Sequence, residues 1–255
     1  MQTLISGTTM PVLEIGLDPG EVIVAPPGEM AWMTPNVRMN TTMATAGSSG
    51  LWGAISRAVS GGGLFMTEFS TDGGPGGVAF TPKVPGQILP VEVGAGRGYM
   101  VHKHGFLCGT QGVVLTTALQ RNLGAGIFGG EGFLLQHITG PCQAWVALGG
   151  EVISPELAPG ETLLVHPGHV GMFEDSVTFD ITTISGIKNA LFGGDGIFLV
   201  RLTGPGRVWL QTMTVPALAH ALAPYMGRES APASNQDPGS AAVSGVMRGI
   251  FGSDR

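Results

Sequence analysis

Two pairs of histidines have the residue type and spacing that could hold a metal ion. His102 and His104 are separated by one residue. Side chains at positions i and i+2 of a strand point to the same side of it, as chelation by imidazole requires. His166 follows His102 by 64 residues, in a turn of similar sequence that also contains His169. These four histidines are the candidate metal ligands of the chain.

The wider pattern around these histidines agrees only in part with a known metal motif. Gly96-x5-His102-x-His104 has the opening spacing of the first cupin motif, but residues 106–110 (Phe-Leu-Cys-Gly-Thr) replace the glutamate expected after it. Gly160-x5-His166 resembles the second cupin motif with a spacing that is off by one residue. A metal-dependent, cupin-like enzyme is therefore the second hypothesis. The first is that these histidines are polar turn residues, so that no cofactor is expected.

Other motifs that could perform chemistry are weaker. Residues 124–129 spell Gly-x-Gly-x-x-Gly, but a dinucleotide-binding motif follows a strand and opens a helix, whereas glycines and an expected strand follow here. Cys108 and Cys142 belong to no Cys/His cluster, and we expect two small buried residues. The chain contains no nucleophile elbow and no phosphate-binding lysine motif. We therefore expect a protein that is not an enzyme.

The composition of the chain limits the classes of molecule that the protein is expected to bind. Only 12% of the 255 residues are charged, about half the usual quarter, and the net charge is −6. Such a chain offers no basic stripe for nucleic acid. The mean hydropathy is +0.29, yet no apolar run of about 18 residues could span a membrane. With no signal-peptide pattern at the start, we expect a cytoplasmic protein whose apolar surface is covered in a homo-oligomer or by a partner.

The strongest signal in the sequence is an internal repeat. Residues 93–149 align with residues 157–213 at a constant offset of 64, and Trp145 pairs with Trp209. Both windows contain a Gly-Gly-acid-Gly element followed by Thr-Gly-Pro. A weaker first copy is indicated by residues 17–21, which match residues 157–161. Three divergent copies are therefore predicted, at about 17–90, 91–156 and 157–215.

Each copy has the turn residues and apolar stretches that are typical of a strand-rich unit. A Pro/Gly turn precedes an apolar strand at residues 162–165, an alternating strand follows at 177–182, and a hairpin has arms at 197–202 and 207–213. This pattern predicts one all-β domain over residues 1–215, a β-sandwich or double-stranded β-helix whose copies pack around a pseudo-threefold axis. Residues 216–255 are expected to form an extension with a short helix, a flexible linker and an apolar end.

Apolar, glycine-rich links between the strands are the candidate interaction face. Its members are Trp52, Ile55, Ile127, Phe128, Leu191 and Phe192, together with Ile250 and Phe251 at the apolar end. One interpretation is that the links plug one end of a barrel. The other is that they form a sticky surface through which the protein self-associates, with a trimer slightly preferred, or docks on a protein partner or a membrane surface.

Residues 193–212 carry a resemblance to a known family. Their sequence, Gly-Gly-Asp-Gly-Ile-Phe-Leu-Val-Arg-Leu-Thr-Gly-Pro-Gly-Arg-Val-Trp-Leu-Gln-Thr, is similar to the signature of the altered-inheritance-of-mitochondria-twenty-four family. The resemblance covers about residues 1–215. It implies a fold like that of the tryptophan RNA-binding attenuation protein, and it implies neither an enzymatic activity nor a ligand. A non-enzymatic scaffold or interaction protein is therefore the leading hypothesis.

Overall fold

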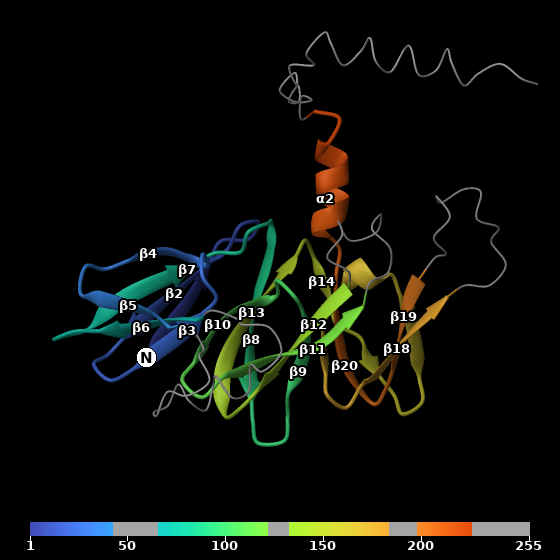
Figure 1. Ribbon diagram of the computed structural model, residues 1–255, viewed down its shortest axis with the longest axis horizontal. Helices are drawn as coiled ribbons and strands as arrows, with labels where there is room; N and C mark the ends of the chain where they lie inside the picture. The colour runs from blue at the N-terminus through green and yellow to red at the C-terminus, as the bar shows by residue number, and fades with distance from the viewer. Residues whose placement is uncertain (43–65, 122–132, 184–197, 226–255) are drawn as a thin grey trace, which may run out of the picture. The chain divides into compact units, whose positions relative to one another are not determined.

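The computed structural model of the protein describes residues 1–42, 66–121, 133–183 and 198–225 (Figure 1). The chain divides into a compact unit, Met1–Leu218, and a second unit, Ala219–Arg255. In the described residues the first unit is all-β, as predicted from the sequence, and its sheets are antiparallel. The described part of the chain contains no helix long and apolar enough to cross a lipid bilayer.

After the short strand β1 (Gln2–Ser6), the strands fall into three consecutive segments of similar order. Segment 1, residues 12–80, contains β2 (Val12–Leu17), β3 (Val22–Ala25), β4 (Met30–Met33), β5 (Val37–Thr42), β6 (Met66–Thr71) and β7 (Gly76–Phe80). Segment 2, residues 86–149, contains β8 (Gly86–Val93), β9 (Tyr99–His102), β10 (Phe106–Thr110), β11 (Val114–Arg121), β12 (Phe133–Thr139) and β13 (Cys142–Gly149).

Segment 3, residues 152–211, has the same order with its first strand divided in two. It contains β14 (Val152–Ile153), β15 (Glu156–Leu157), β16 (Thr162–Val165), β17 (Val170–Glu174), β18 (Thr178–Thr183), β19 (Phe198–Thr203) and β20 (Gly206–Gln211), with the 3₁₀ turn η1 (Pro167–His169) between β16 and β17. The helix α2 (Val215–Leu222) follows β20.

The sequence explains these strands locally. Along β2, Leu13, Ile15 and Leu17 are buried while the residues between them are exposed, the alternation of a strand with one face on the core. A tight turn follows the first strand of each segment, and Gly20, Gly96 and Gly160 adopt positive φ angles of 92°, 75° and 79° there. A Cβ atom at these glycines would meet nothing within 4 Å, so the backbone conformation and not space requires glycine.

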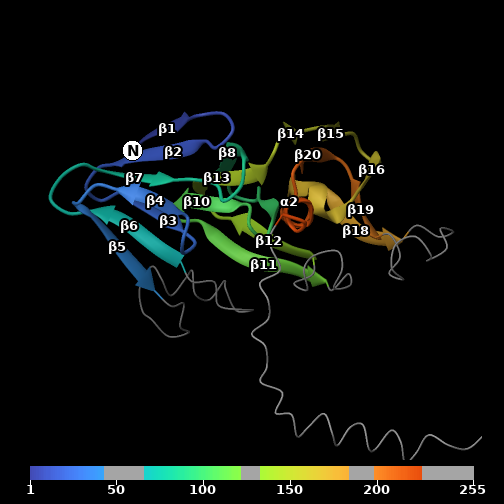
Figure 2. The same cartoon turned by 90° about the horizontal axis from the view of Figure 1, so that it is seen from above.

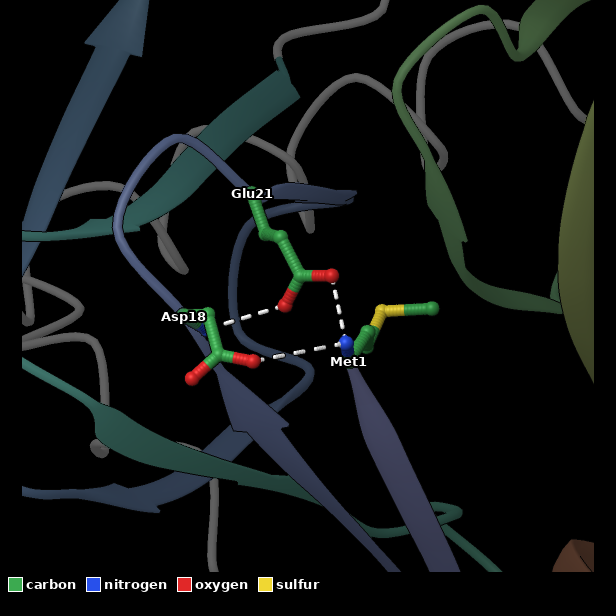
Figure 3. A network of polar contacts seen from close by, with 3 residues as sticks. All are labelled: Met1, Asp18 and Glu21. Atoms are coloured by element: carbon green, nitrogen blue, oxygen red, sulfur yellow. Dashed lines mark hydrogen bonds and ion pairs between the residues drawn. The ribbon is translucent and has the colours of Figure 1, made fainter.

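The same turn is closed by a glutamate in two of the segments. Glu21 accepts a hydrogen bond from the backbone N–H of Asp18 at 2.9 Å and also contacts the amino group of Met1 (Figure 3). The hydrogen bond from Asp18 lowers the pKa of the Glu21 carboxyl. Glu161 accepts in the same way from the N–H of Ala158, at 2.8 Å. The shared sequence of residues 17–21 and 157–161 therefore produces a shared hydrogen bond.

Within each segment the six strands pair in the same way. The sixth strand lies between the first and the third, as β7 does between β2 and β4, β13 between β8 and β10, and β20 between β15 and β17. The fifth strand lies between the second and the fourth, as β6 does between β3 and β5, β12 between β9 and β11, and β19 between β16 and β18. Each segment thus contributes two sets of three strands.

Neighbouring segments are joined by one strand pair each. The second strand of segment 1, β3, pairs with the third strand of segment 2, β10 (Figure 2). In the same way, β9 of segment 2 pairs with β17 of segment 3. The predicted pseudo-threefold arrangement is not confirmed, because its closure requires β16 to pair with β4. Instead, both strands lie at the ends of their sheets, and the pairings form an open series of three.

The core also crosses the segment boundaries. Trp145 of β13 is buried among Leu13, Phe69 and Phe80 of segment 1. Trp209 of β20 packs against the core of segment 2, where its ring lies 5.9 Å from that of Tyr99 in an edge-on arrangement. Each tryptophan thus extends from one segment into the core of the preceding one. The segments are therefore parts of one folded unit.

Candidate functional site

A cavity of about 380 Å³ lies where turns from all three segments come together. Its lining includes Glu29 from the β3–β4 turn, His102 and His104 from the β9–β10 turn, and Pro167 and Gly168 from η1. These are equivalent turns, each between the second and third strands of its segment. The volume is within the range of small-molecule pockets, roughly 300–1,000 Å³.

Most of the remaining lining is apolar. Val84, Phe133, Leu148, Val170 and Met213 contribute to the walls. On one side the carboxylate of Glu29 pairs with the ammonium of Lys83 at 2.5 Å, and the Glu29 side chain is largely buried while that of Lys83 is exposed. An apolar cavity with a few polar groups can bind a ligand, provided that these groups are free to contact it.

The side chain of Gln211, another polar group of the lining, is engaged in holding the backbone. The Gln211 side chain accepts from the N–H of Gly149 at 3.0 Å and donates to the carbonyl of Gly168 at 2.9 Å. The backbone carbonyl of Gln211 lies 2.8 Å from Nδ1 of His169. Gln211 therefore ties the end of β13 to η1 by hydrogen bonds.

His102 is held in a neutral form. Burial, and secondarily the nearby His104, lowers the pKa of His102 to about 4, while the backbone of Ala147 acts in the opposite direction. Nδ1 of His102 accepts a weak hydrogen bond from the N–H of His104 at 3.4 Å, which assigns the proton of the neutral ring to Nε2. Nε2 is buried and has no hydrogen-bond partner within the described chain. A metal ion would have to displace packed atoms to reach Nε2.

The other two predicted metal ligands face their own turn. Nδ1 of His166 accepts from the N–H of Gly168 at 3.4 Å, and the centroids of the His166 and His169 rings lie 5.8 Å apart. Burial, followed by the proximity of His169, lowers the pKa of His166. Only the backbone neighbours Pro167 and Gly168 belong to the cavity lining. Across residues 1–42, 66–121, 133–183 and 198–225, no three His, Cys, Asp or Glu side chains are grouped to hold a metal ion.

The two cysteines are buried and unpaired. Burial raises the pKa of the Cys142 thiol to about 11 and also raises the pKa of the Cys108 thiol well above its ordinary value. Neither thiol is therefore available as a thiolate nucleophile or ligand near neutral pH. The predicted interaction face lies outside the described residues: Trp52, Ile55, Ile127, Phe128, Leu191, Phe192, Ile250 and Phe251.

A second candidate site, which the sequence analysis did not identify, consists of the two sheet-edge strands β4 and β16. Trp32 and Met33 of β4 are 52% and 36% exposed, and Leu164 of β16 is 51% exposed. The repeat places Trp32 at the position of Met172 in β17, which is fully buried. The sequence signal was the apolar stretch 30–33, which aligns with residues 170–173 and lies in the first of the three segments.

Comparisons with known proteins agree with this architecture. A protein-family model described as mitochondrial biogenesis AIM24 matches residues 3–213. An uncharacterized protein of Streptococcus pyogenes serotype M6 is 29% identical over 223 residues, which are 86% of this chain and 88% of that protein. The crystal structure of a Streptococcus pyogenes protein, a structural genomics target, is similar with a TM-score of 0.70 and 26% identity, covering 88% of this chain and 99% of that one. The chain therefore belongs to the mitochondrial biogenesis AIM24 family.

Proposed function

We propose that this protein is a non-enzymatic scaffold that associates with further copies of itself. The observation that carries the proposal is the position of its exposed apolar side chains. Trp32, Met33 and Leu164 lie on strands that end a sheet, each with one edge unpaired among the strands that the structure describes. Unpaired backbone groups beside exposed apolar side chains favour the addition of another strand.

The cavity supports a structural role for its polar residues. Gln211 is committed to the backbone, Glu29 pairs with Lys83, and the buried ring of His102 is neutral near pH 7. A metal-dependent, cupin-like enzyme that uses His102, His104 and His166 is the alternative. It has less support because these side chains do not converge. Stoichiometric metal in the purified protein, lost in His104→Ala, would favour the enzyme over the scaffold.

Two finer features of the scaffold are also proposals. The three segments are divergent copies of one unit, which is supported by the repeat in the sequence and by the recurring strand order. The glycine-rich links around residues 51–55, 123–130 and 187–194 form a further contact between molecules, which is supported by their apolar composition alone. A cytoplasmic homotrimer is the first assembly to test.

Light scattering after size-exclusion chromatography tests the scaffold proposal directly. The full chain has a mass of 26.2 kDa. We expect the measured mass to be a multiple of this value and to rise with protein concentration, because self-association follows mass action. A mass of one chain at every concentration up to high micromolar would overturn the proposal.

A further inference from the structure

The two junctions between segments have the same register. At the first junction, Val24 of β3 lies opposite Gly109 of β10, and Ile23 lies opposite Thr110. At the second junction, Met100 of β9 lies opposite Phe173 of β17, and Tyr99 lies opposite Glu174. The repeat aligns Val24 with Met100 and Gly109 with Phe173, so the pairs coincide. One fixed geometry therefore joins the second strand of a segment to the third strand of the following segment.

The two outer strands, β16 and β4, occupy the two positions that pair with each other at the junctions between segments. β16 is the second strand of segment 3, and β4 is the third strand of segment 1. Neither has a second partner among the described strands. If the register of the inner junctions is applied to them, Leu164 lies opposite Met33 and Val165 lies opposite Trp32. Since one molecule leaves both halves open, the partner that fits each is another molecule of the same chain.

Burial distinguishes the outer strands from their inner equivalents. All four residues of β10 and β17 that align with β4 are buried, whereas Ala31, Trp32 and Met33 of β4 are exposed. Leu164 is 51% exposed, while its equivalent Val24 in β3 is 1% exposed. The residues of the outer strands are therefore as apolar as those of the inner junctions but lack the neighbour that would cover them.

The outer strands also lack the features that protect natural sheet edges. Charged side chains and proline commonly prevent edge-to-edge pairing. The edge strand β5 carries Arg38, β18 carries Asp180, and β8 carries Pro90 and Glu92. By contrast, β4 (Met-Ala-Trp-Met) and β16 (Thr-Leu-Leu-Val) contain no charged residue and no proline. Their sequences are suited to a covered junction.

We infer that molecules assemble head to tail, with β16 of one molecule pairing antiparallel with β4 of the next in the register Leu164–Met33. This inference rests on the proposed self-association and specifies the surfaces that perform it. The contact is heterologous, because two different strands meet, so repeated addition gives a ring if the rotation closes and a fibre if it does not. Each contact would join the sheet that β16 ends in one molecule to the sheet that β4 ends in the next.

Disulfide trapping between two singly substituted proteins tests the register. The variants Leu164→Cys and Met33→Cys are mixed under reducing conditions, concentrated and then oxidised. Both positions are exposed in the isolated chain, so the substitutions leave the fold intact. Cys108 and Cys142 are buried with raised pKa values and do not compete. We expect a crosslinked dimer from the mixture and little from either variant alone.

The matched control is a mixture of Leu164→Cys with Trp32→Cys. Position 32 is one residue out of register, and its side chain points to the opposite face of the strand. Equal crosslinking in both mixtures would overturn the proposed register. An oligomer detected by light scattering that gives no crosslink would do the same. Either result would leave the proposal of self-association intact. A strictly monomeric protein would overturn both the register and the proposed scaffold function.

Discussion

The strands β17 and β4 occupy the same position in their segments and differ in what lies beside them. β17 lies between β9 and β20, and its Met172 and Phe173 are buried. β4 pairs with β7 on one side, and the equivalent residues Trp32 and Met33 are exposed. Both strands are apolar. In a series of similar segments, therefore, exposure depends on the place of a segment in the series rather than on its residue types.

This difference sets the expected strength of the contact between molecules. Covering one large apolar side chain completely contributes about 1.5–3 kcal/mol, and the outer strands offer three that are only partly exposed. Association also costs about 4–15 kcal/mol because each molecule loses translational and rotational freedom. The backbone hydrogen bonds add about 0.5–1.5 kcal/mol each. These opposing contributions favour an assembly that responds to protein concentration over a permanent one.

Alanine substitutions at the equivalent positions 172 and 32 should lower the free energy of unfolding by different amounts, because one lies at an inner junction and the other at an outer edge. Met172→Ala removes a fully buried side chain and should lower the free energy of unfolding by about 2–5 kcal/mol. Trp32→Ala removes a larger but exposed side chain and should lower it by less than about 1 kcal/mol in dilute protein. Urea denaturation at low concentration measures both. Similar losses in the two variants would show that the two strands have similar environments.

A second comparison concerns His102 in the middle segment and His166 in the outer one. Burial lowers the pKa of His102 to about 4, against an ordinary value of 6.5. Because the folded state binds this proton less readily than the unfolded state, the contribution of His102 to stability is present above about pH 6.5 and is lost as the pH falls towards 4. The full effect is up to about 3 kcal/mol.

The variant His102→Gln isolates this contribution. We expect its free energy of unfolding, measured between pH 7 and pH 4, to fall less steeply than that of the wild-type protein. The matched substitution His166→Gln should change the slope in the same direction and by a smaller amount, since His166 is less deeply buried. A larger change for His166→Gln would contradict the assignment of His102 as the more strongly shifted group.

Local features of the sequence predicted the strands, and the inter-segment pairing could not be predicted from it. Residues 162–165 form β16 as expected, and the turn glycines fall at equivalent places. The prediction of a hairpin with arms at 197–202 and 207–213 was wrong, because β19 pairs with β16 and β18 whereas β20 pairs with β15 and β17 in other sheets. The pairing of β3 with β10 joins residues more than 80 positions apart, and no local pattern encodes which strands of different segments meet.

The candidate site was predicted less completely, for the same reason. The sequence identified the turns of His102 and His166, and their neighbours do line one cavity. Metal binding was inferred from spacing, which says nothing about whether an imidazole nitrogen is accessible. Burial of His102 depends on packing around the loop, including the backbone of Ala147 from β13. The edges β4 and β16 were missed because their exposure depends on which strands of other segments lie beside them, and no pattern within a strand encodes that.

A charge on the edge strand should weaken assembly without unfolding the chain. Leu164 is half exposed in the isolated molecule, so Leu164→Lys places its ammonium in water there and changes the unfolding free energy by less than about 0.5 kcal/mol. In the proposed contact the same ammonium would lie against Met33 and lose its hydration. Even a modest penalty of about 1.4 kcal/mol raises the concentration needed for assembly about tenfold.

Light scattering over a concentration series measures this shift, and Leu222→Lys provides the matched control. Leu222 is 47% exposed and belongs to the helix α2 rather than to a strand, so the same charge there should leave the assembly curve unchanged. Adding Met33→Lys to Leu164→Lys charges both halves of the contact with the same sign and should weaken assembly further. If Leu164→Lys and Leu222→Lys assemble alike, β16 does not form the contact, and the difference between inner and outer strands has no consequence for association.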